Sequence, residues 1–222
     1  MNDHPTRCTP DLDRRRAFAW FSLLAGVASI LLLIASMQPT APIGAEQLAF
    51  FAAHWGFYVL MAILVLVWAV FSIPFVVALG QLLRSKSPSF ALAATILSAV
   101  GILLLGFAIF ARIGAFLSIL SAGRPATSPD AIYQAAIWGN IFYFLTDPGL
   151  MTWGLGQLLF GWLAWKSGVL PNWASVVGVV GGIAGLLTLA AYQSGVLALT
   201  QLGCFAVWGL VTAAVLLRKR GV

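Results

Sequence analysis

The 36 residues from Leu48 to Leu83 include no Asp, Glu, Lys or Arg, and this run limits the possible folds more than any other feature of the chain. As a single helix it would be roughly 54 Å long, whereas about 20 apolar residues suffice to cross a bilayer. Only 8% of the chain is charged, against about 25% in soluble domains. So few charges cannot cover a water-facing surface. We therefore predict a membrane protein whose main partner is the lipid bilayer, with no nucleic-acid partner.

The apolar runs predict an all-α fold: a polytopic membrane helix bundle with six transmembrane helices in three hairpins and short interfacial helices on the extracytoplasmic side. Residues 48–83 and 132–165 are each too long for one span. We place an interfacial helix at 46–55, and we divide the second run at Asp147-Pro148. The predicted spans are residues 17–37, 57–83, 89–111, 147–165, 172–193 and 196–217, flanked by basic cytoplasmic tails at 1–16 and 218–222.

Ten of the twelve basic residues fall in four clusters. Basic residues gather on the cytoplasmic side of membrane helices. If all four clusters are cytoplasmic, the chain crosses the membrane six times and both termini are cytoplasmic, whereas seven spans would put one terminal cluster on the wrong side. The clusters are Arg7 with Arg14, Arg15 and Arg16; Arg84 with Lys86; Lys166; and Arg218, Lys219 and Arg220.

Small residues recur at helical spacing in three of the predicted spans. Lipid offers no hydrophobic drive for helix association, so close packing depends on small side chains. These faces predict tight helix contacts, although they could equally line a substrate path. They are Ser22, Gly26 and Ser29; Gly154, Gly161 and Gly168; and Gly178, Gly181, Gly182 and Gly185.

The pentapeptide Leu-Gly-Gln-Leu-Leu occurs twice, at 79–83 and at 155–159. Internal repeats are common in membrane folds. Short matches also arise by chance in an apolar chain of low complexity. An old duplication of hairpins and a coincidence therefore both stay open.

The segment GWLAWKSGVLPNWASVVGVVGGIAGLL, residues 161–187, contains a span that ends in Lys-Ser-Gly, a Leu-Pro pair and then a glycine-rich span. This pattern resembles a family of uncharacterised bacterial six-pass integral membrane proteins, a domain of unknown function of the 4386 type. The resemblance implies a six-helix bundle in a bacterial inner membrane. It implies no activity and no site residues.

Asp147 is the one charged residue within residues 132–165. It lies 19 residues before Lys166, which is about 28 Å of helix. With Lys166 at the inner rim, Asp147 falls at the outer rim. Asp followed by Pro is typical of a helix start, where the carboxylate accepts backbone N–H groups. We expect Asp147 to cap the fourth span, and the alternative is a ligand or proton site.

Three further ionisable residues are predicted at the outer rim. His54 precedes Trp55 at the predicted interface, where an imidazole can lie in water. Alternatively, His54, Glu46, Arg112 and Asp147 converge at an outer mouth of the bundle, with Arg112 paired to Asp147 or Glu46.

Uncharged polar residues complete the candidate site. Tyr143 and Asn140 lie in the extracytoplasmic segment before Asp147. Gln157 lies about 13 Å along the helix from Lys166, close to the midplane. We expect Gln157 to form an interhelical hydrogen bond.

No motif of a serine hydrolase, zinc protease, phosphate loop or EF-hand occurs in the chain. His54 is the only histidine outside the N-terminal tail, which excludes bis-histidine haem and three-histidine zinc within the bundle. We expect no cofactor, metal or catalytic residue. The favoured function is a non-enzymatic inner-membrane accessory or assembly partner of another membrane protein. The alternatives are a small transporter or lipophilic-ligand binder with its site at the outer mouth, and then an intramembrane enzyme.

Overall fold

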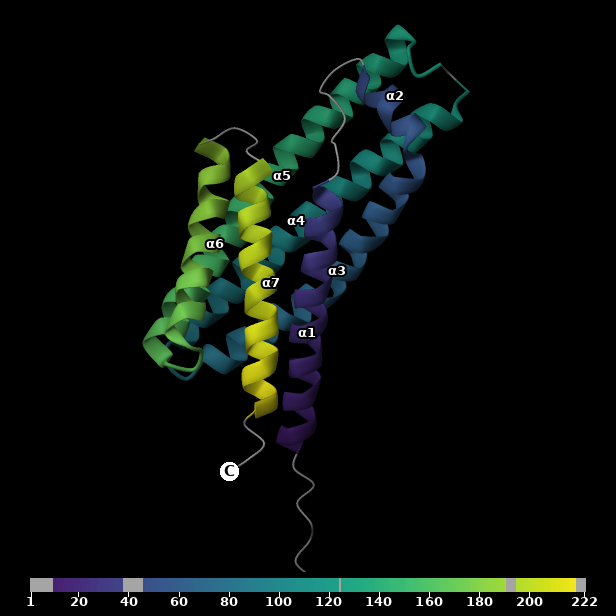
Figure 1. Cartoon of the computed structure of the whole chain (residues 1–222). Helices are drawn as coiled ribbons and strands as arrows, with labels where there is room; N and C mark the ends of the chain where they lie inside the picture. The colour runs from purple at the N-terminus through teal and green to yellow at the C-terminus, as the bar shows by residue number, and fades with distance from the viewer. Residues whose placement is uncertain (1–9, 38–45, 124, 191–194, 219–222) are drawn as a thin grey trace, which may run out of the picture.

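The computed structural model describes residues 10–37, 46–123, 125–190 and 195–218, and within these ranges it contains helices and no strand (Figure 1). The predicted tails at 1–16 and 218–222 fall mostly outside the described residues, as do residues 191–193 of the predicted fifth span. The helices are α1 (Pro10–Ser36), α2 (Glu46–Ala53), α3 (Trp55–Leu83), α4 (Pro88–Ser121), α5 (Pro129–Ser167), α6 (Asn172–Ala190) and α7 (Gly195–Arg218).

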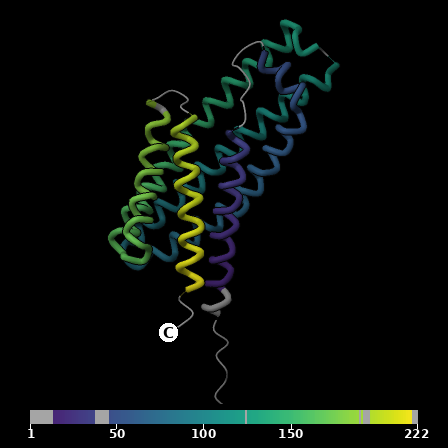
Figure 2. The backbone as a smooth tube through the Cα atoms, in the orientation of Figure 1, coloured from purple at the N-terminus to yellow at the C-terminus, as the bar shows by residue number. Residues whose placement is uncertain are grey.

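The six long helices form a closed ring in chain order. Each of α3, α4, α5, α6 and α7 packs against the long helix before it, and α7 packs against α1 to close the ring. Helices α1, α6 and α7 run nearly parallel to one another, while α3, α4 and α5 are tilted away from them (Figure 2). The ring therefore encloses an interior that all six helices share.

Four helices are long and apolar enough to cross a bilayer: Arg14–Ser36 within α1, and α3, α4 and α7. The protein is thus a helical membrane protein. The start of α1, the end of α7 and the turns after α3 and α5 all lie at the lower end in Figure 1. This end, which we name the basic end, carries the described members of all four basic clusters: Arg14, Arg15, Arg16, Arg84, Lys86, Lys166 and Arg218.

Glycines on two faces of α5 bring neighbouring backbones close. A Cβ on Gly154 would lie 2.9 Å from the Gly182 carbonyl oxygen and 2.9 Å from Gly185 Cα on α6. On the opposite side, a Cβ on Gly156 would collide with Ser98 on α4. Helix α5 therefore joins α4 to α6 through contacts that only glycine permits.

The other small-residue faces are also turned inward. Gly26 and Ser22 of α1 face Gly209 of α7, where a Cβ would lie 2.7 Å from the Ser22 carbonyl oxygen. Gly178 of α6 accommodates the Trp208 ring of α7. The Trp208 indole then donates to the Ala174 carbonyl of α6. The predicted packing role is confirmed for Gly26, Gly154, Gly161 and the α6 glycines, and it operates within one chain. It is wrong for Gly168, which is the exposed C-cap of α5 with φ 62° and has no neighbour within 4 Å of an added Cβ.

Buried apolar side chains form two separate cores. The larger core fills the ring and centres on an aromatic group from α3, α5 and α7: Trp68, Trp153, Phe205 and Phe75. The smaller core lies beyond it, where α2 covers the far ends of α3, α4 and α5, with Leu48, Phe51 and Phe116 fully buried. Helix α2 occupies most of the predicted interfacial helix at 46–55.

The predicted break at Asp147-Pro148 is wrong, because α5 is one helix of 39 residues with Pro148 inside it. A proline inside a helix removes one backbone hydrogen bond, and membrane helices tolerate this loss when other groups compensate. Here the freed carbonyl is that of Phe144, one turn before the proline. The Thr152 and Thr146 hydroxyls bond two other carbonyls nearby, those of Pro148 at 2.6 Å and of Phe142 at 2.7 Å. Asp147 is therefore an interior helix residue and not a cap.

The helix of the predicted third span, 89–111, does not end at residue 111, since α4 continues to Ser121. The extra turns of α4 instead pack Ile113, Phe116 and Ile119 into the smaller core. Packing against α2 and α5, rather than the length of a span, determines where α4 stops.

The tight contact at Gly154 predicts a large effect of one methyl group. Gly154→Ala should lower the free energy of unfolding by about 1–3 kcal/mol, because the new Cβ meets helix backbone that has to move. Gly114→Ala is the matched control, since a Cβ on this exposed α4 glycine meets nothing within 4 Å. The measurement is the unfolding midpoint in mixed micelles of increasing SDS content. Equal midpoints for the two variants would contradict the α5–α6 contact.

Candidate functional site

A partly open cavity of about 350 Å³ lies inside the ring. This volume is within the range of about 300–1,000 Å³ that is usual for small-molecule sites. All six long helices contribute to its walls, which are mainly apolar. The lining side chains include Leu32 and Ser36 of α1, Val65 of α3, Leu105 and Ile109 of α4, Thr188 of α6, and Ala198, Leu199 and Leu202 of α7.

The cavity begins where the glycine contacts of α5 end. Gly149 is the first glycine of the close-packed part of α5, where a Cβ would lie 3.3 Å from the Gly101 carbonyl oxygen of α4. Farther from the basic end, α5 presents large side chains instead, and the tilted helices diverge from α1 and α7 (Figure 2). The α5 wall consists of Phe142, Tyr143, Thr146, Asp147, Leu150 and Trp153.

Two tryptophans close the cavity on the side of the basic end. The rings of Trp68 and Trp153 lie 5.3 Å apart, and Phe205 lies 5.0 Å from Trp153 behind them. The Trp68 indole donates to the Ser29 hydroxyl at 2.9 Å. The Trp153 indole N–H is buried and has no hydrogen-bond acceptor among the described residues. A buried donor without a partner costs stability.

Asp147 is the one carboxylate in the described wall of the cavity. Its side chain is half-buried, and no hydrogen bond or ion pair joins it to another described residue. The unbroken course of α5 places Asp147 between Tyr143 and Leu150 on the face that lines the cavity. A carboxylate with acceptor capacity left over, set in an apolar wall, can bind a donor or a cation.

Arg112 occupies a smaller hollow of about 90 Å³ next to the cavity. Its guanidinium lies over three aromatic rings, at 4.5 Å from Phe142, 5.4 Å from Phe116 and 6.0 Å from Tyr143. Phe142 lines both spaces. Arg112 makes these cation–π contacts, and among the described residues it forms no ion pair with Asp147 or Glu46.

The remaining predicted site residues lie outside both spaces. The His54 imidazole is exposed, stacks on Phe50 at 4.3 Å and donates through Nδ1 to the Phe50 carbonyl at 2.9 Å. Glu46 is exposed in the first turn of α2, and Asn140 is exposed on α5. The structure thus brings Tyr143 and Asp147 to one cavity with Arg112 beside it.

Gln157 is buried on α5, with its amide packed against Gly181 of α6. Neither atom of this amide has a hydrogen-bond partner among the described residues, so the expected interhelical bond is not formed. Gln201 of α7 forms such a bond instead, donating to the Leu150 carbonyl of α5 at 3.2 Å. The glycine face of α6 presents no acceptor to Gln157.

Most of the cavity wall was not predicted from the sequence, because its residues are ordinary apolar ones. Two of them carried a usable signal. Tryptophan is enriched at membrane interfaces, yet Trp68 and Trp153 lie in the interior of long spans and are both buried. Large side chains at such positions have to be accommodated between helices.

A family model described as a domain of unknown function (DUF4386) matches residues 17–220. The chain belongs to the DUF4386 family. The match runs from within α1 to the end of α7, so it includes every helix that lines the cavity. No curated protein and no solved structure matches this DUF4386 protein. Because the family description names no activity, function has to be argued from the cavity itself.

An interior position for Asp147 predicts that its charge contributes little to stability. Asp147→Asn should leave the unfolding midpoint of the ligand-free protein unchanged, because the carboxylate satisfies no backbone N–H group. The comparison variant is Ser128→Ala, since the Ser128 hydroxyl accepts the Ala131 amide at the true start of α5. Its loss should cost roughly 0.5–1 kcal/mol. A larger loss for Asp147→Asn than for Ser128→Ala would restore the capping role.

Proposed function

We propose that this protein binds a lipophilic molecule in the cavity of the helix ring, with an amine or other cationic donor of the ligand facing Asp147. The observation that carries the proposal is an apolar cavity of about 350 Å³ whose wall holds one carboxylate without a partner among the described residues. Small-molecule sites combine such apolar walls with a few polar groups that fix orientation. The apolar walls favour a ligand that partitions into lipid.

Asp147 and the tryptophan rings define how the ligand would lie. Asp147 supplies acceptors on the side away from the basic end, and the rings of Trp68 and Trp153 close the cavity on the side nearer to it. Asp147 and Trp153 are six positions apart on α5, or about 9 Å along the helix. A ligand with a cationic head and an apolar body would place its head at Asp147 and its body against the two rings.

The proposed setting is a bacterial inner membrane, crossed six times, with both termini in the cytoplasm. The position of all four described basic clusters at one end of the ring supports this topology, because basic residues gather on the cytoplasmic side. Helix α6, with 19 residues, and the half of α5 nearer the basic end would supply the two crossings beyond the four most apolar helices. The cavity would then lie in the outer half of the membrane.

The role of accessory or assembly partner stays a prediction. Its basis was the abundance of small-residue faces, and the contacts of Gly26, Gly154 and Gly178 use those faces inside the bundle. The cavity therefore supports ligand binding more directly than these faces support a partner. The alternative of an intramembrane enzyme likewise stays a prediction, and we assign no catalytic residues to it among the described ones.

Ligand binding is tested with matched probes, since the natural ligand is unidentified. A long-chain primary amine should raise the thermal midpoint of the purified protein in detergent more than the alcohol of equal chain length does. Asp147→Asn should abolish the difference, because the amine loses its counter-charge. Equal shifts for the two probes in the wild-type protein would contradict the cationic head.

A second pair of variants tests whether the cavity is the place of binding. Ala198→Phe fills the cavity from α7 and should remove the shift caused by both probes. Val196→Phe is the control, because Val196 is 73% exposed on the same helix. Retention of the shifts in Ala198→Phe would overturn the proposed site.

A further inference from the structure

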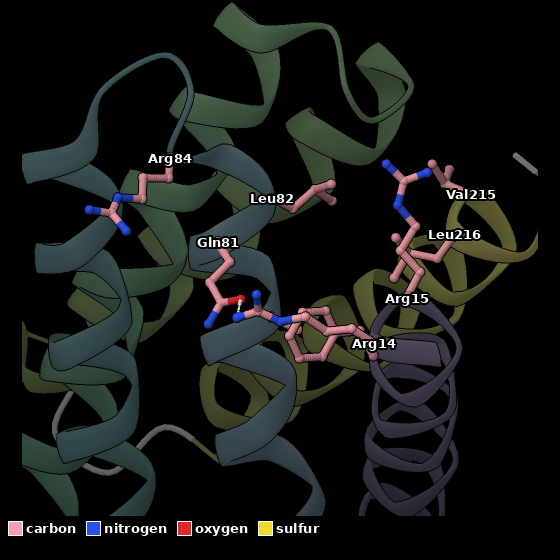
Figure 3. A pocket seen from close by; sticks show the side chains of 9 residues that line it. Arg14, Arg15, Gln81, Leu82, Arg84, Val215 and Leu216 are labelled. Carbon is pink, nitrogen blue, oxygen red and sulfur yellow. Dashed lines mark hydrogen bonds between the residues drawn. The ribbon is translucent and has the colours of Figure 1, made fainter. Parts of the chain in front are cut away.

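A second hollow, of about 400 Å³, lies at the basic end, where α1, α3 and α7 meet (Figure 3). Three arginines border it: Arg14 and Arg15 of α1, and Arg84 of α3. The rest of its wall is mainly apolar and includes Phe18, Leu82 and Val215. The hollow therefore has a cationic rim and an apolar interior. The rim is complementary to the anionic head group of a phospholipid, and the interior is complementary to its apolar chains.

Arg14 is held in place by two contacts. Its Nη2 donates to the Gln81 side-chain oxygen of α3 at 2.6 Å, and its guanidinium lies 5.5 Å from the Phe18 ring centre. Figure 3 shows Arg14 reaching from α1 across to Gln81. A guanidinium has five N–H donors, so the bond to Gln81 leaves several for an anion. An arginine fixed in this way binds an anion at a smaller entropic cost.

The charged side chains that line the hollow, among the residues whose side chains are described, are all arginines. Arg15 extends beside Val215 and Leu216 of α7 (Figure 3), and no acidic side chain is among the described residues that line the hollow. Arg84 lies on the far side of α3 and points away from the other two (Figure 3). It also borders a neighbouring hollow between α3 and α4. Arg84 thus contributes to the positive electrostatic potential near the hollow more than to direct contacts with a bound anion.

We propose that this hollow binds the phosphate group of an anionic membrane lipid. Arg14 and Arg15 bind the phosphate oxygens, because a guanidinium matches phosphate geometry and forms charge-assisted bonds with it. Phe18, Leu82 and Val215 contact the first carbons of the acyl chains. Basic pockets between membrane helices recognise lipid head groups in this way. The apolar wall favours a lipid over a soluble phosphate compound with the same head.

This lipid site is independent of the function proposed for the cavity. It lies at the other end of the ring and shares no lining residue with the cavity that contains Asp147. Lipid bound here would connect α1, α3 and α7 at the boundary between lipid and water. An experiment that contradicts one of the two proposed sites therefore does not contradict the other.

Native mass spectrometry of the full chain tests the assignment. The protein is released from detergent in the presence of equal amounts of phosphatidylglycerol and phosphatidylcholine. The wild-type protein should retain phosphatidylglycerol in preference. The double variant Arg14→Gln/Arg15→Gln should bind phosphatidylglycerol roughly tenfold more weakly, from the loss of two charge-assisted contacts.

Two controls separate this site from general attraction of anions. Lys86→Gln removes a positive charge near the same end without lining the hollow, and it should leave the preference for phosphatidylglycerol intact. Excess glycerol 3-phosphate, the head group without acyl chains, should not displace the lipid. A loss of preference in Lys86→Gln equal to that in the double variant would overturn the site. Displacement by glycerol 3-phosphate would overturn its assignment to a lipid.

Discussion

Close contact between the glycines of α5 and the backbones of α4 and α6 is the interaction on which the rest of the structure depends. In a membrane, apolar side chains gain little by leaving lipid for protein, so helix association depends on close packing. Gly149 and Gly156 face α4, while Gly154 and Gly161 face α6. These contacts extend from Gly149 towards the basic end. Beyond Gly149 the helices separate, and the cavity occupies the space between them.

The glycines of the two Leu-Gly-Gln-Leu-Leu segments have the same packing role, whereas the glutamines do not. Gly80 of α3 and Gly156 of α5 both present their missing side chains to α4, against Thr95 and Ser98 respectively. The two glutamines have different environments. Gln81 is exposed and holds Arg14 at the proposed lipid site, whereas Gln157 is buried against Gly181. A shared packing partner accounts for the glycine in both copies, and the history of the repeat stays open.

Most helices were predictable from the sequence because their ends are marked by local chemistry. The predicted spans at 57–83 and 196–217 lie within two residues of α3 and α7, since turn residues and charges bound these apolar runs. Asp147-Pro148 led to the wrong prediction of a helix break for the same reason, because the pair has the local sequence pattern of a helix start. The helix nevertheless continues through Pro148. Both of its halves pack on α4, through Ala131 and Ala135 before the proline and through Gly149 and Gly156 after it.

The candidate site was less predictable than the fold. Asp147 and Tyr143 were identified as candidates, but the reason for their importance was not, since it depends on where six helices separate. His54 was suggested by its rarity, and among the described residues its imidazole contacts Phe50, four positions earlier in the chain. A cavity whose walls are Leu, Val, Ile and Ala has no motif. It is defined by the tilt of α3, α4 and α5, which no short sequence pattern encodes.

The most direct test of a continuous α5 with Asp147 in the cavity wall is a nitroxide scan of residues 140–153. Cys8 and Cys204 are replaced first, and the mobility and oxygen accessibility of each label are measured in lipid nanodiscs. An unbroken helix predicts a period of about 3.6 residues through positions 147 and 148. Labels at 143, 147 and 150 should be immobilised further by Ala198→Phe, while the label at 144, where Phe144 is 78% exposed, should not. A phase break at 147–148 would contradict the continuous helix, and no response of these three labels to Ala198→Phe would contradict the place of Asp147 in the cavity wall.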